Sequence, residues 1–147
     1  MLATKRNKSR SGFTLVELAV VVVIIGVLAA FAVPRFLSSV ERSKAAEAFN
    51  YLATVHSSME RYHARQGTYA NALADLDVGL GTPEYFSVGP VAVPASEADL
   101  QTGWEVTMTR SGPSAGYGPY TVVFNHNGFD PVSSTIDAEI SPLQTGS

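Results

Sequence analysis

A largely apolar run from Phe13 to Val33 constrains this chain more than any other feature of its sequence, because it contains one charged residue, Glu17. The run is 21 residues long, and a helix that crosses a bilayer needs about 20. A carboxylate in hydrocarbon costs several kcal/mol unless it is paired or protonated. The run therefore predicts a membrane-spanning helix, and the position of Glu17 requires a specific reason.

The residues before the run allow three interpretations of this segment. Residues 1–12 carry four cations and no acid, which favours a cytoplasmic location for this end of the chain. The segment fits a secretory signal peptide cut after Ala32, an uncleaved membrane anchor, or a prepilin signal cut on the cytoplasmic side of the run. Glu17 favours the third interpretation, because an acid in the first turn benefits neither a signal peptide nor a simple anchor.

The run Gly12-Phe13-Thr14-Leu15-Val16-Glu17 closely resembles the cleavage site of type IV pilins and type II secretion pseudopilins. The resemblance extends over residues 10–69. It implies that residues 1–12 are a leader, removed by the prepilin peptidase between Gly12 and Phe13, and that Phe13 is then N-methylated. It also implies a single-pass protein of the bacterial inner membrane with a cytoplasmic N-terminus. Inner-membrane assembly machinery would polymerise it, with identical or homologous subunits, into a periplasmic or extracellular filament.

The implied cleavage gives Glu17 a physical role. The new amine at Phe13 lies one helical turn from Glu17, whose carboxylate also favours the positive end of the helix dipole. Between subunits, Glu17 of one chain can pair with the Phe13 amine of its neighbour, and only the register that pairs a buried carboxylate is favourable. We therefore predict that Glu17 sets the register of assembly. The alternative is that Glu17 lies at the level of the lipid headgroups.

The apolar pattern continues beyond the membrane run with a helical period. Its stripe comprises Leu37, Val40, Ala45, Ala48, Leu52, Val55, Met59 and Tyr62. Because Gly67 is a typical helix stop, the sequence predicts one helix from Phe13 to Gln66. Residues 13–34 would form its transmembrane or filament-core half, and residues 35–66 would form an amphipathic stem.

Gly26 and Pro34 weaken the middle of this predicted helix. Proline lacks the amide hydrogen that would bind the carbonyl of Ala30, and glycine has a low helix propensity. The resemblance implies that the segment between them can lose its helical structure in filaments. For the isolated subunit we predict a continuous, kinked helix.

Residues 67–147 predict a globular, β-rich head. Strands are expected at Trp104–Thr109, Tyr120–Phe124 and Ser134–Ile140, a helical turn at Ala72–Leu76, and loops at 77–103 and Ser111–Pro119. One long helix followed by strands predicts an α+β fold with a small antiparallel sheet packed on the stem. The head is too small for a generous core without the apolar stripe of the stem.

Two groups of residues in this region have metal-ligating side chains. His56, Glu60 and His63 share a helix face and suit a metal, but we favour a solvated flank of the stem. Asn125–Asp130 offers oxygen ligands where pseudopilins often bind calcium, but Asn127-Gly128 also favours a hairpin turn, which we prefer. We therefore predict no cofactor, with calcium in the head as the open alternative. No catalytic triad is evident, so the chain is predicted to be a substrate and not an enzyme.

The distribution of charge limits the partners. The head carries nine acids and one cation, Arg110, which disfavours nucleic acid and hence DNA uptake. The lower-stem cations Arg35, Arg42 and Lys44 are instead candidates to face head acids of a neighbouring subunit. Those acids include Asp75, Asp77 and Glu84.

The predicted function is that of a structural subunit of a type IV pilus or pilus-like filament. A type II secretion pseudopilin is the alternative, and a secreted soluble binding protein with an ordinary signal peptide is more remote. The chain has no cysteine, unlike many type IV pilins, and it lacks the acids of a pseudopilin calcium loop. The sequence therefore leaves the choice between pilus and pseudopilus open.

Overall fold

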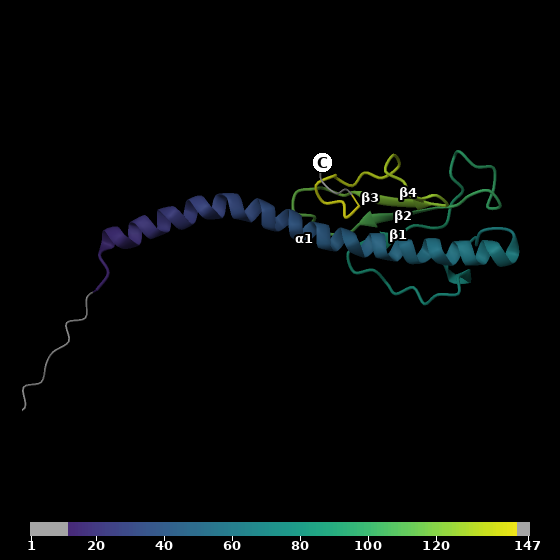
Figure 1. Ribbon diagram of the computed structural model, residues 1–147, viewed down its shortest axis with the longest axis horizontal. Coiled ribbons are helices and arrows are strands. Elements are labelled where there is room, and N and C mark those ends of the chain that lie inside the picture. The colour runs from purple at the N-terminus through teal and green to yellow at the C-terminus, as the bar shows by residue number, and fades with distance from the viewer. Residues whose placement is uncertain (1–11, 144–147) are drawn as a thin grey trace, which may run out of the picture. The chain divides into compact units, whose positions relative to one another are not determined.

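The computed structural model describes residues 12–143 and confirms the predicted α+β class (Figure 1). The predicted leader, apart from Gly12, lies outside the described residues. The elements are helix α1 (Leu15–Gln66), the short 3₁₀ helix η1 (Leu73–Asp75), and strands β1 (Phe86–Val88), β2 (Glu105–Arg110), β3 (Thr121–Asn125) and β4 (Gly128–Phe129). The chain divides into two compact units after Phe36.

Helix α1 runs without a break through both Gly26 and Pro34. It ends at Gln66 as predicted, because Gly67 takes a left-handed conformation with φ +73°. The Gly67 N–H donates to the carbonyl of His63 at 2.8 Å. Such a residue satisfies one of the last helical carbonyls and turns the chain away from the helix axis.

The C-terminal half of α1 lies beside an antiparallel sheet with strand order β1-β2-β3-β4 (Figure 1). The middle of the predicted stripe is buried, whereas Leu37, Val40 and Tyr62 remain at least partly exposed. Buried side chains of β2 and β3 form the other side of the core, where Val106 is paired with Phe124 and Met108 with Val122. The sheet therefore covers the apolar stripe that residues 35–66 cannot bury alone.

Two predictions about the strands are wrong. Residues 77–103 are not only a loop, because β1 forms there and pairs with β2. The predicted strand Ser134–Ile140 is irregular. Its Ser134 and Thr135 hydroxyls accept hydrogen bonds from the N–H groups of Val123 and Thr121 at 2.9 and 2.8 Å. Side-chain hydroxyls thus replace backbone carbonyls as acceptors along this edge of β3, where the Thr135 N–H still donates to the Thr121 carbonyl at 3.1 Å.

A hairpin is confirmed here, but its turn lies at His126-Asn127, one residue before the predicted Asn127-Gly128, because Gly128 already pairs with Asn125 as part of β4. Gly128 has φ +101°, but His126 and Asn127 are not among the described residues with positive φ. The hairpin therefore does not use the primed turn that Asn-Gly favours. Instead the Asn127 N–H donates to the side-chain oxygen of Asn125 at 2.8 Å.

The carboxylate of Asp77 joins the segment after η1 to α1. Asp77 binds Arg61 at 2.8 Å and Arg65 at 3.0 Å. Hydrogen bonds from these guanidinium groups lower the pKa of Asp77 from 3.8 to about 2. Both carboxylate oxygens of Asp77 therefore bind cations of the same chain, which argues against the predicted role of Asp77 as a contact for a neighbouring subunit.

We expect Asp77→Asn to lower thermal stability slightly, with the full effect above about pH 4. The folded pKa lies below the unfolded value of 3.8, so the stabilisation is present above the unfolded value and is lost as the pH falls toward 2. Melting curves of the two proteins between pH 2 and pH 7 should converge at the acid end. A difference in melting temperature that stayed constant across this range would contradict the assignment.

Candidate processing and assembly site

The predicted cleavage position lies directly before α1. Gly12 and Phe13 are exposed and precede the helix. A Cβ atom added at Gly12 would meet no atom of this chain within 4 Å. Any requirement for a small residue at Gly12 therefore comes from an enzyme that must fit around the peptide bond, and not from the fold.

Thr14 and Glu17 form a capping box at the N-terminus of α1. The Thr14 N–H and hydroxyl donate to a Glu17 carboxylate oxygen at 2.8 and 2.9 Å. In return, the Glu17 N–H donates to the Thr14 hydroxyl at 3.2 Å. Two N–H groups that lack helical partners are thereby satisfied. Sequence reasoning missed this arrangement, although Thr-x-x-Glu before an apolar run is its signal.

The capping box gives Glu17 a partner within its own chain. The predicted pairing of Glu17 with the Phe13 amine of another subunit requires a second chain, so it stays a prediction. The two roles are compatible in chemical terms, because a carboxylate offers about four acceptor positions.

The helix that follows Glu17 presents apolar side chains on all sides. Its large apolar residues through Phe36 are exposed by 48% or more. By length and composition, α1 qualifies to cross a membrane. Gly26 adds no side chain to this surface, and Pro34 lies within the helix near the end of the apolar run.

A buried ion pair fixes the stem to the head. Glu41 is fully buried and accepts a hydrogen bond from Arg110 Nε at 2.6 Å and another from Tyr120 at 3.0 Å. Lys44 lies 3.8 Å from the same carboxylate. Burial raises the pKa of Glu41, but the hydrogen bonds from Arg110 and Tyr120 and the nearby positive charges outweigh it, so the pKa lies below its ordinary value.

All five N–H donors of Arg110 have acceptors. Its Nε and Nη2 bind Glu41, and Nη1 donates to the Tyr85 carbonyl at 3.2 Å. The remaining donors bind the carbonyls of Ser111 and Pro113. Arg110, the only lysine or arginine of residues 67–147, is thus buried and joins several segments of the head to one another and to the stem. Sequence analysis did not predict this pair, although Glu41 precedes Ala45 and Ala48 at helical spacing on the apolar stripe.

His56, Glu60 and His63 lie on one face of α1, but each side chain contacts a different group, and they do not form the metal site that was considered. His56 contacts the His126 carbonyl at 3.2 Å, and His63 contacts the Gln101 carbonyl at 3.2 Å. Glu60 accepts a hydrogen bond from Tyr69 at 3.1 Å. Within residues 12–143, no group of three or more His, Asp or Glu side chains is placed to hold a metal ion.

The oxygen-rich segment Asn125–Asp130 is also occupied by local hydrogen bonds. One carboxylate oxygen of Asp130 accepts from the N–H groups of Val132 and Ser133 at 2.9 and 3.2 Å. A hydrogen bond from the Ser133 side chain, together with these backbone bonds, lowers the pKa of Asp130. Calcium binding in this segment remains a prediction.

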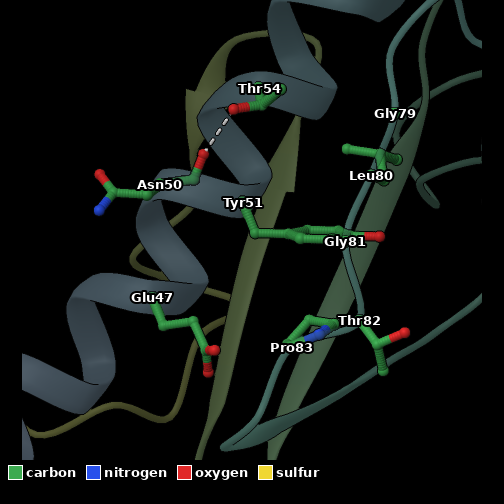
Figure 2. A pocket seen from close by; sticks show the side chains of 9 residues that line it. All are labelled: Glu47, Asn50, Tyr51, Thr54, Gly79, Leu80, Gly81, Thr82 and Pro83. Atoms are coloured by element: carbon green, nitrogen blue, oxygen red, sulfur yellow. Dashed lines mark hydrogen bonds between the residues drawn. The ribbon is translucent and has the colours of Figure 1, made fainter.

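An open groove of about 370 Å³ lies between α1 and the segment 79–83. Figure 2 shows the ring of Tyr51 extending from α1 toward that segment. At one end, the Glu47 carboxylate accepts hydrogen bonds from the N–H groups of Glu84 and Tyr85 at 2.8 and 2.9 Å. Glu47 thus holds this part of the head on the stem, and we assign the groove no ligand.

The sequence is similar to those of several known proteins. Residues 7–33 match the family model for the prokaryotic N-terminal methylation motif. The chain is 37% identical over 71 residues to the type IV major pilin protein PilA of Myxococcus xanthus, covering 48% of this chain and 32% of the relative. It is 34% identical over 79 residues to type II secretion system core protein G of Vibrio cholerae, covering 54% of each chain.

A shorter alignment has a higher identity. The chain is 58% identical over 38 residues to the type IV major fimbrial protein FimA of Dichelobacter nodosus, covering 26% of this chain and 24% of the relative. These alignments span about half or less of each relative. Together with the methylation motif, they show that up to about half of this chain is similar to type IV pilins and to a type II secretion core protein, and the long helix followed by a small sheet agrees with this similarity.

Proposed function

We propose that this chain is a structural subunit of a type IV pilus or pilus-like filament. The prepilin peptidase cuts after Gly12 and methylates Phe13. Before assembly, the apolar part of α1 spans the bacterial inner membrane with its N-terminus in the cytoplasm. Assembly machinery in that membrane then polymerises the subunit with identical or homologous subunits into a filament. The role is structural, and neither catalysis nor nucleic acid binding is part of the proposal.

The observation that carries this proposal is a helix with exposed apolar residues all round, joined to a folded head. Large apolar side chains from Phe13 to Phe36 are between 48% and 84% exposed. A surface of this size and character requires a cover, because soluble proteins rarely expose large apolar patches. Lipid provides the cover before assembly, and the equivalent helices of other subunits provide it in the filament.

We expect Gly12→Val to block processing, because the peptidase must accommodate a small residue beside the scissile bond. Gly12→Ala should largely be processed, and it is the matched control, since neither change meets another atom of this chain at its Cβ. Mass spectrometry of the membrane fraction measures the result as loss or retention of the leader. A methylated Phe13 terminus on the Gly12→Val protein would contradict the proposed cleavage.

A type II secretion pseudopilin is the second candidate function. The alignment with core protein G of Vibrio cholerae is longer than the two pilin alignments, 79 residues against 71 and 38. Deletion of the gene separates the two functions. Loss of surface filaments with normal protein secretion supports a pilus, whereas loss of secreted enzymes with normal surface filaments supports a pseudopilus.

A further inference from the structure

Burial along α1 changes abruptly at Glu41. None of residues 15–40 is buried, whereas Glu41 is fully buried. The head therefore covers little of this segment, and a helix with few tertiary contacts depends on its surroundings for stability. Gly26 and Pro34 lower it further. The segment before Glu41 is therefore the part of α1 that can lose helical structure at the lowest cost.

The contacts of Glu41 hold α1 on several separate segments. Arg110 is the last residue of β2, and Tyr120 directly precedes β3. Arg110 also binds the carbonyl of Tyr85, next to β1. A change in the position of Glu41 would therefore have to break hydrogen bonds to β2 and to the start of β3 at once.

We propose that the Glu41–Arg110 ion pair is a stop that confines loss of helix to the part of α1 before Glu41. Residues 15–40 can then change conformation as their surroundings change, while the stem and the head keep their structure. This device belongs to the single subunit, so it does not depend on the proposed filament function.

An ion pair suits this role better than apolar contacts alone. Apolar side chains can slide against one another and still remain buried, because hydrophobic burial is not directional. Rotation or displacement of the helix at Glu41 would separate a buried carboxylate from the buried guanidinium that pairs with it, which is strongly unfavourable. The next buried residues of the stem, Ala45 and Ala48, are small and offer no comparable anchor.

The test disturbs the helix on one side of Glu41 and measures its stability on the other. Ser39 is exposed, so Ser39→Pro removes no buried side chain but disrupts the preceding turn and starts a new helical segment. Hydrogen exchange is measured by mass spectrometry on the full chain in detergent micelles. In the Ser39→Pro protein, we expect peptides covering 45–52 to exchange at the wild-type rate.

Adding Glu41→Gln to Ser39→Pro should speed exchange in residues 45–52 by about tenfold or more. The matched control adds Glu47→Gln instead, which removes another carboxylate that joins α1 to the head. This control should leave exchange in 45–52 as it is in Ser39→Pro alone. The proposal is overturned if Ser39→Pro alone speeds exchange in 45–52 equally, or if adding Glu41→Gln has no greater effect than adding Glu47→Gln.

A milder variant covers the case in which Glu41→Gln unfolds the whole head, seen as exposure of Trp104 to a fluorescence quencher. Tyr120→Phe removes only one hydrogen bond to Glu41. Combined with Ser39→Pro, it should give a smaller increase in exchange that is confined to residues near 45–52. Wild-type exchange there in this double variant would overturn the proposal.

Discussion

Replacing Arg110 with methionine is expected to lower the melting temperature of the detergent-solubilised protein by more than about 10 °C. The change leaves the carboxylate of Glu41 fully buried without its guanidinium partner. Breaking a buried pair from one side costs about 3–5 kcal/mol, which is a large part of the stability of a small domain. The fluorescence of Trp104, the single, fully buried tryptophan, reports the unfolding.

Two further proteins show whether burial is the cause. Arg61→Met breaks an ion pair with Asp77 in which the arginine side chain is 51% exposed, and such pairs contribute only about 0.2–1 kcal/mol. The double change Glu41→Met with Arg110→Met removes both charges and should recover much of the lost stability. The explanation fails if Arg110→Met and Arg61→Met lower the melting temperature equally.

The helix could be predicted from sequence because its signals are local. The stripe from Ala45 to Met59 repeats with a helical period, and Gly67 provides the stop that the structure confirms. Strand β1 could not be predicted in the same way, because its three residues lie in a segment rich in glycine and proline. Its formation depends on pairing with β2, more than 15 residues further along the chain.

The same distinction applies to the sites. Gly12, Phe13 and Glu17 lie within six consecutive residues, so their arrangement follows from one helix start. Glu41 and Arg110 are 69 positions apart, and their pairing is decided by how the sheet packs on the stem. Glu41 precedes Ala45 and Ala48 at helical spacing, but neither its burial nor its partner was predicted from the sequence.

The structure adds a second explanation for Glu17 to the one predicted from the sequence. One is helix capping, in which the Glu17 carboxylate accepts hydrogen bonds from Thr14. The other is charge pairing with the amine of Phe13 in a neighbouring subunit. Glutamine can replace glutamate in a capping box, but it has no charge. Alanine at Thr14 removes the threonine hydroxyl while the charge of Glu17 remains.

Glu17→Gln is therefore expected to reduce filament yield by about tenfold or more, the largest effect on assembly of any change considered. Thr14→Ala should leave assembly nearly normal, because an exposed cap contributes only about 0.5–2 kcal/mol. Glu17→Ala should assemble as poorly as Glu17→Gln, yet remain in the membrane, since removing an acid eases its insertion into lipid.

Three measurements on the same cells separate assembly from earlier steps. Membrane fractionation reports insertion, mass spectrometry of the N-terminus reports cleavage and methylation, and the mass of sheared filaments reports assembly. With insertion and processing intact, loss of filaments in Glu17→Gln but not in Thr14→Ala would assign the role of Glu17 to its charge. The reverse result, with normal filaments from Glu17→Gln and few from Thr14→Ala, would assign it to the capping box, because only the hydroxyl of Thr14 would then be required.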